Sequence, residues 1–231
     1  MSTTTLSLLV ALSGILTWVM QASIIVPMAV VWRRRQHLSP SIRLLSFYVY
    51  LSLLCSVGAR LAELSHDPNW PWLVGFNMGK IALFGGVYYL VLRQRLVRRL
   101  VAALTVATLV FGLFAILRLE MAQVVTYARV LQCALLAAFA LAYLEQVSRE
   151  PPQGSIHRTP LFLVSVAQLL YSAGTVMYFS IDYVKLVPAY AKIYFGIVAI
   201  LGLLFNALLT LAFYWAQPEP ESQRASVLAT A

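Results

Sequence analysis

The chain has 231 residues, of which 61% are hydrophobic and 11% are charged, and its formal net charge at pH 7 is +9. Soluble domains carry charge on about a quarter of their residues, so this composition excludes an ordinary soluble fold. The basic residues lie in short connecting segments and not on a folded basic face, which argues against nucleic-acid binding. The sequence therefore predicts an all-α polytopic membrane protein.

Apolar segments of about 20 residues, the length that crosses roughly 30 Å of hydrocarbon, follow one another along nearly the whole chain. Residues 1–216 are predicted to form a single membrane domain, and the polar residues 217–231 a disordered cytoplasmic tail. This arrangement leaves no stretch for a soluble domain. The seven predicted transmembrane helices occupy residues 5–32, 42–65, 71–92, 99–118, 120–146, 159–184 and 187–216.

Arginines are concentrated in the first, third and fifth connections between these helices, whereas the second connection carries Asp67 near Glu63. An excess of Lys and Arg in short loops marks the cytoplasmic side of a membrane. The N-terminus is therefore predicted to lie outside and the C-terminus in the cytoplasm. The clustered arginines are Arg33, Arg34, Arg35, Arg43, Arg93, Arg95, Arg98, Arg99, Arg149 and Arg158.

The fourth predicted helix differs from the others, because nothing between Val101 and Leu117 is more polar than Thr105 and Thr108. A helix that is apolar on every side faces lipid over much of its circumference. The second, third, fifth, sixth and seventh helices instead carry polar residues at offsets of three and four, which places them on one face. Lipid cannot satisfy such faces, so they are predicted to meet inside the bundle.

A short internal similarity suggests a repeat. Residues 53–58 (Leu-Leu-Cys-Ser-Val-Gly) resemble residues 169–174 (Leu-Leu-Tyr-Ser-Ala-Gly), and the helices that follow contain Lys80-Ile81 and Lys192-Ile193. These segments would divide the chain into three helices, a linker helix and three helices, a 3+1+3 plan. Parallel repeats of this kind occur in transporters. The alternative is that Leu, Ser and Gly recur by chance.

Lys80 and Arg129 are the basic residues expected deepest in the membrane. Each lies nine positions from the outer end of its predicted helix, or about 14 Å at 1.5 Å per residue. A basic group at that depth costs at least about 2.5 kcal/mol on insertion scales, and such residues usually line functional interiors. The alternative is that both side chains bond to carbonyls and neighbouring polar groups and only hold the bundle together.

We therefore predict a polar pocket in the outer half of the bundle, lined by the second, third, fifth, sixth and seventh helices. Its excess positive charge would suit a small anionic ligand. The candidate ligand-binding residues are Ser56, Arg60, Asn77, Lys80, Arg129, Gln132, Gln168, Tyr171, Thr175, Tyr178 and Lys192.

Catalytic residue patterns are missing from the sequence. His37, His66 and His157 all fall outside the predicted helices, and neither HExxH, nor GxSxG, nor a pair of intramembrane carboxylates is present. We therefore expect no enzyme, no catalytic residues and no metal. Glu63, His66 and Asp67 could share one helical turn and bind a metal, although exposed polar residues of a loop are usually only solvated.

Residues 191–196 (Ala-Lys-Ile-Tyr-Phe-Gly) resemble the segment of microbial rhodopsins that carries the retinal lysine. The resemblance implies Lys192 as a Schiff-base lysine and retinal as a cofactor. The chain departs from that family at Lys80, where a carboxylate counter-ion would stand, and the main expectation is that no cofactor is bound. The plan is also similar to that of small 3+1+3 sugar transporters, whose helix-interior prolines are absent here apart from Pro27.

The chain is also similar, over most of its length, to an uncharacterised family of small bacterial seven-helix membrane proteins. That resemblance implies a fold and a bacterial inner (plasma) membrane, but no activity. The residues that carry it are Pro27, Thr126, Tyr127, Arg129, Pro160-Leu161-Phe162, Leu170-Tyr171-Ser172-Ala173-Gly174 and Phe205-Asn206-Ala207-Leu208-Leu209.

The functional hypothesis is a receptor-like sensor of a small anionic ligand that enters from the outer side and acts through a membrane or cytoplasmic partner. A 3+1+3 transporter is the alternative, and a retinal-binding protein is the third. The expected partners are membrane lipid, the ligand and a signalling protein, with no nucleic acid.

Overall fold

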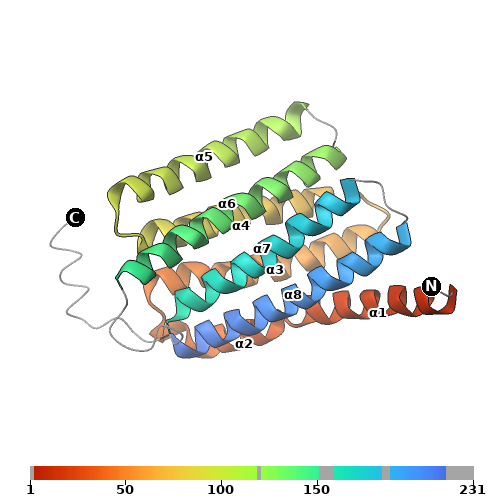
Figure 1. The fold of residues 1–231 in the computed structure, drawn as a ribbon, viewed down its shortest axis with the longest axis horizontal. Helices are drawn as coiled ribbons and strands as arrows, with labels where there is room; N and C mark the ends of the chain where they lie inside the picture. Colours follow the sequence, from red (N-terminus) through yellow and green to blue (C-terminus); the bar gives the residue numbers. More distant parts are fainter. Residues whose placement is uncertain (1–2, 119–120, 151–158, 184–187, 217–231) are drawn as a thin grey trace.

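The computed structural model describes residues 3–118, 121–150, 159–183 and 188–216. These residues form helices joined by short connections and contain no strand (Figure 1). The described chain confirms an all-helical bundle of seven segments long and apolar enough to cross a membrane, whereas the predicted tail at 217–231 lies outside it. The segments are Ser7–Arg34, Pro40–Leu64, Trp70–Val91, Arg95–Leu117, Thr126–Arg149, Pro160–Tyr178 and Gly196–Trp215.

Half of the described α-helices have a proline in their first two positions. Pro40, Pro71, Pro160 and Pro188 occupy the first or second position of their helices, where a missing backbone N–H leaves no helical hydrogen bond unmade. Eight α-helices and one 3-10 turn result within the described residues. They are α1 (Thr3–Ala22), α2 (Ile25–Arg34), η1 (Arg35–His37), α3 (Pro40–Leu64), α4 (Trp70–Val91), α5 (Arg95–Arg118), α6 (Met121–Arg149), α7 (Pro160–Tyr183) and α8 (Pro188–Trp215).

The first predicted helix is broken into α1 and α2, which corrects the single helix expected over residues 5–32. The cause is Pro27, which cannot donate a hydrogen bond to the carbonyl of Ser23. That carbonyl instead accepts the N–H of Val26 at 3.1 Å, in a tighter turn. The side chain of Asn206 in α8 then donates to Met20 O at 3.2 Å and to Ser23 Oγ at 2.7 Å, so that α8 holds the break.

The helices pack in the order α3, α4, α6, α7 and α8, with α1 and α2 against α8 and α2 also in contact with α3 (Figure 1). α5 lies at the edge, in contact with α4 and α6, as its apolar sequence predicts. Thr105 and Thr108 of α5 are buried and donate to carbonyls of their own helix at 2.7 Å. Gly85 of α4 lets Thr105 approach closely, because an added Cβ would collide with the threonine side chain.

The two ends of the bundle differ in charge. The N-terminus, the end of α3 and the start of α4 lie at one end (Figure 1). The opposite end carries the arginines that close α2 and α6 and those that surround the start of α5. The structure therefore separates the basic connections from the N-terminal end, which we call the N-terminal face.

We predict that Asn206→Leu destabilises the protein by about 1 kcal/mol, because two interhelical hydrogen bonds that hold the helix break are lost. Thermal unfolding of the purified protein in detergent measures the effect. Thr210→Val is the matched control, since the Thr210 hydroxyl bonds only within α8, to the carbonyl of Asn206. Equal melting temperatures for Asn206→Leu and the wild type would contradict this role.

Candidate functional site

A cavity of about 430 Å³ opens at the N-terminal face of the bundle. Its volume lies within the range of roughly 300–1,000 Å³ typical of small-molecule sites. Its lining comes from α1, α3, α4, α6, α7 and α8, and includes both charged and aromatic side chains. Along α3 the lining extends from Glu63, next to the helix end, to Tyr48 fifteen residues earlier, or about 22 Å of helix.

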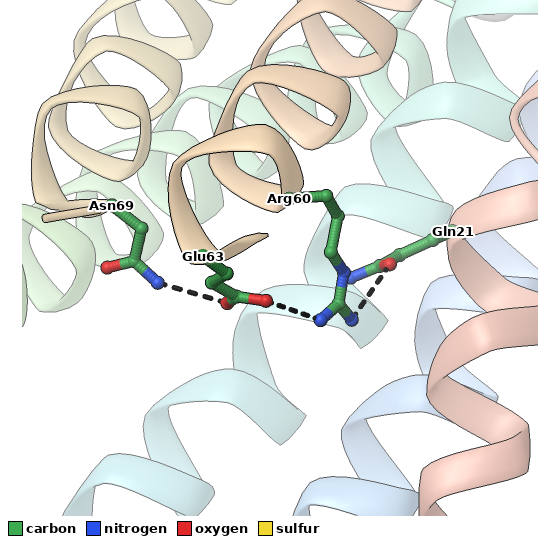
Figure 2. Close-up of polar contacts among 4 residues, drawn as sticks. All are labelled: Gln21, Arg60, Glu63 and Asn69. Atoms are coloured by element: carbon green, nitrogen blue, oxygen red, sulfur yellow. Dashed lines mark hydrogen bonds and ion pairs between the residues drawn. The ribbon is translucent and has the colours of Figure 1, made fainter. Parts of the chain in front are cut away.

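The mouth of the cavity is crossed by a chain of polar contacts (Figure 2). The Arg60 guanidinium donates to Glu63 Oε2 at 2.7 Å and to Gln21 Oε1 at 3.3 Å, and it lies 4.4 Å from the centre of the Trp18 ring. Asn69 donates to the other oxygen of Glu63 at 3.1 Å. Arg60 thus joins α3 to α1, and its charge is already paired with Glu63.

The middle of the cavity holds Ser56, Thr175 and Arg129, each eight residues from the end of its helix at the N-terminal face. That spacing corresponds to a depth of about 12 Å. Arg129 is close enough to Lys80 to interact with it electrostatically. Glu63 at the mouth is the one acidic residue among the described residues of the lining, so the middle of the cavity is electropositive.

The floor of the cavity consists of aromatic rings that also enclose the side chain of Lys80. Tyr48, Tyr171 and Phe205 line the cavity. The Lys80 ammonium lies 4.5 Å from the ring centre of Tyr171, 5.0 Å from Phe205, 5.4 Å from Tyr48 and 5.6 Å from Phe84. The Cys133 thiol and the Arg129 guanidinium also lie close enough to the ammonium to interact with it electrostatically. Each cation–π contact without water is worth about 2 kcal/mol.

Lys80 is only 1% exposed and lies behind the floor, not in the cavity. Asn77, Gln132 and Gln168 are buried in the same way between α4, α6 and α7. Within the described residues each keeps one polar atom without a hydrogen-bond partner. Because buried polar groups are normally satisfied, this layer is suited to hold ordered water.

The structure therefore separates the predicted site residues into two layers. Ser56, Arg60, Arg129, Tyr171, Thr175 and Tyr178 line the cavity. Asn77, Lys80, Gln132 and Gln168 are buried behind its wall. Lys192 belongs to α8, but its side chain lies outside the described residues, so the resemblance to a retinal lysine stays a prediction.

Sequence reasoning missed the first helix as a wall of the cavity and most of the aromatic lining. Met20, Gln21 and Ile24 line the cavity. Trp72 and Phe76 of α4 also line it. In an apolar helix, the sequence does not distinguish an aromatic residue that lines a cavity from one that faces lipid. Tyr48 and Ser52 could have been predicted as lining residues, because they belong to the polar stripe of α3.

A metal site at the turn after α3 finds no support. Glu63 is engaged with Arg60 and Asn69. In the part of the chain that the structure describes, no three His, Cys, Asp or Glu side chains gather in a way that could hold a metal ion. The arrangement of the cavity instead offers a cationic middle, hydroxyl groups and aromatic faces, which are groups that bind an organic anion.

The fold and the cavity together define a seven-helix membrane protein with a ligand-sized cavity at one face. Comparisons of the chain with models of protein families, with curated proteins and with solved structures find no match. Any function therefore has to be argued from the cavity itself.

We predict that Arg60→Ala opens the mouth and speeds the reaction of Cys55, which lines the cavity, with N-ethylmaleimide. The expected increase is roughly fivefold, because the lost contacts between α1 and α3 are worth about 1 kcal/mol. The reaction is followed by intact-protein mass spectrometry on the Cys133→Ala background.

Glu63→Gln is the matched control for this experiment. It removes the ion pair but leaves the contacts of Arg60 with Gln21 and Trp18, so it should have a smaller effect. If Arg60→Ala leaves the rate of Cys55 modification unchanged, Arg60 does not close the mouth.

Proposed function

We propose that this protein is a receptor-like membrane protein that binds a small anionic ligand in the cavity of the N-terminal face. The observation that carries the proposal is the placement of charge: Arg129 lines the middle of the cavity, and the Lys80 ammonium lies behind its aromatic floor. The acidic Glu63 stands at the mouth, paired with Arg60. Among the charged side chains that the structure describes in the lining, an anion that passes the mouth therefore meets Arg129 and no further carboxylate.

Lys80 can act on such a ligand without touching it. The rings of Tyr48, Tyr171 and Phe205, which line the cavity, lie between 4.5 and 5.4 Å from the Lys80 ammonium at their centres. At a separation of roughly 8 Å, two unit charges still interact by about 2 kcal/mol at an effective dielectric constant near 20. In this proposal Arg129 contacts the anion, and Lys80 raises the potential of the floor.

We further propose that the N-terminal face lies outside the cell and that the protein resides in a bacterial inner membrane. The support is the basic end of the bundle, which carries arginines at the ends of α2 and α6 and at the start of α5. An excess of arginine marks the cytoplasmic side. With that orientation the cavity takes its ligand from the outside.

In the sensor form of the proposal, the first helix transmits ligand binding to a partner protein. α1 contributes the wall formed by Thr17, Met20 and Gln21, and α2 continues to the basic end. We propose that α1 shifts relative to α2 at the break between them when the cavity is filled, while Asn206 keeps the break in contact with α8. This couples the outer cavity to the opposite face, where a cytoplasmic partner would bind.

The charge of the cavity is tested with two thiol reagents of opposite charge, an anionic and a cationic methanethiosulfonate. They are applied to the outer face of cells that express the Cys133→Ala protein. We expect Cys55 to react faster with the anionic reagent, after correction for the rates of both reagents with a free thiol. Arg129→Gln and Lys80→Met should each lower this rate ratio by at least about tenfold, since a charge near 8 Å acts oppositely on the two reagents.

Arg98→Gln removes the same charge at the opposite end of the bundle, where Arg98 lies on the Tyr89 ring, and should leave the ratio unchanged. Lys80→Met keeps an apolar side chain of similar length between the rings, so the fold is expected to survive. A ratio that favours the cationic reagent would overturn the proposal. Reaction only in inside-out vesicles would overturn the orientation.

A transporter with a 3+1+3 plan is the second candidate, favoured by the position of α5, which lies at the edge of the bundle as a linker helix would. For the sensor we expect proteoliposomes to take up radiolabelled acetate, phosphate and sulfate no faster than empty liposomes. Saturable uptake that Arg129→Gln abolishes would replace the sensor with a transporter.

A further inference from the structure

The floor of the cavity is a fixed set of aromatic faces. The rings of Tyr48 and Phe205 meet edge to face with centres 5.7 Å apart, and those of Tyr171 and Phe205 are also 5.7 Å apart. Phe76 extends the set along α4, with its ring centre 6.0 Å from that of Tyr48. Rings in such mutual contact, with an ammonium between them, have few alternative positions.

The rings of Tyr171 and Phe205 lie deeper in the cavity than Arg129. Arg129 is eight residues after the start of α6, whereas Phe205 is 17 residues after the start of α8 and Tyr171 is 12 residues before the end of α7. At 1.5 Å per residue, these positions correspond to depths of about 12, 26 and 18 Å. A ligand whose acid group meets Arg129 therefore extends its remaining atoms over the rings.

The wall beside the rings is formed mostly by small, apolar residues of α8. Along α8 the lining consists of Val198, Ala199, Gly202, Phe205 and Asn206. Asn206 is the one polar side chain among them, and its amide already donates to Met20 O and Ser23 Oγ. The Lys80 ammonium makes no direct contact with a ligand there, because it lies behind the rings of the floor. The deep part of the cavity is thus a slot with aromatic faces and a small-residue wall, and its volume of about 430 Å³ is far more than a two-carbon acid would fill.

We propose that the ligand is an aromatic acid, or an acid with a similarly flat apolar body, that binds with its acid group beside Arg129 and its ring on the floor of Tyr48, Tyr171 and Phe205. This inference rests on the proposed function and adds the chemical class of the ligand. Stacking against such rings is worth more than the burial of an equal aliphatic area. The acid group provides the negative charge that complements Arg129 in the cavity and Lys80 behind its floor.

The test measures how well small molecules protect Cys55 from N-ethylmaleimide in the purified full-length Cys133→Ala protein. The probes are benzoate, acetate, benzyl alcohol and benzylammonium, which vary the ring and the charge separately. We expect the concentration of benzoate that halves the rate to be at least about tenfold lower than that of acetate or benzyl alcohol, and benzylammonium to protect least.

Phe205→Leu should reduce the advantage of benzoate over acetate by at least about threefold, because one aromatic face of the floor is removed. Tyr48→Phe is the matched control, since it keeps the ring and should keep the advantage. Thermal unfolding establishes that both variants are folded. A second folded variant, Tyr171→Leu, repeats the test on another ring if Phe205→Leu does not fold.

Each other outcome overturns the inference in a recognisable way. Equal protection by acetate and benzoate would mean that the anion is bound without a flat body, and the proposed function would stand. If benzyl alcohol or benzylammonium protected Cys55 as well as benzoate does, the cavity would not recognise an acid group, and the proposed function would be wrong as well. Protection by none of the probes would overturn the aromatic acid, while the charge selectivity of Cys55 still tests the proposed function.

Discussion

A charge inside a membrane needs partners that replace water, and in this protein the Lys80 ammonium has four aromatic rings as those partners. The rings come from α3, α4, α7 and α8, so a single cation holds four helices in register. Association between helices in lipid has no hydrophobic driving force and depends on packing and polar contacts. The cage around Lys80 supplies both, and three of its rings then become the floor of the cavity.

The cavity is thus a consequence of how the bundle accommodates its polar residues. Polar side chains on α6, α7 and α4 turn inward because lipid cannot satisfy them. Asn77, Gln132 and Gln168 fill the space behind the wall, while Arg129 and Thr175 face the opening. The same requirement therefore creates both a buried polar layer and an accessible electropositive cavity.

The first membrane segment differs from the others in its neighbours and in the break between α1 and α2. It packs mainly on α8, and its outer part faces α3 through the contacts of Arg60 with Gln21 and Trp18. The break before Pro27 divides it into a wall of the cavity and a segment that reaches the basic end. In the proposed sensor, this break is the point at which a change in the cavity is passed toward the basic end, because helices bend most easily where the hydrogen-bond ladder is interrupted.

The sequence by itself determined the class of architecture, because the length and apolarity of the segments leave only membrane-spanning helices. The sequence also singled out Lys80 and Arg129 as candidate site residues, because charged side chains are rare so far inside a membrane-spanning helix. Six of the eleven candidate residues line the cavity and four lie behind it, because helical spacing shows which face is polar and not which residues reach the opening. Only the tertiary structure brought Tyr48, Tyr171, Phe205 and Phe84 around one ammonium and placed the broken first helix at the cavity. Contacts between residues far apart in the chain depend on how helices cross, and no local pattern records that geometry.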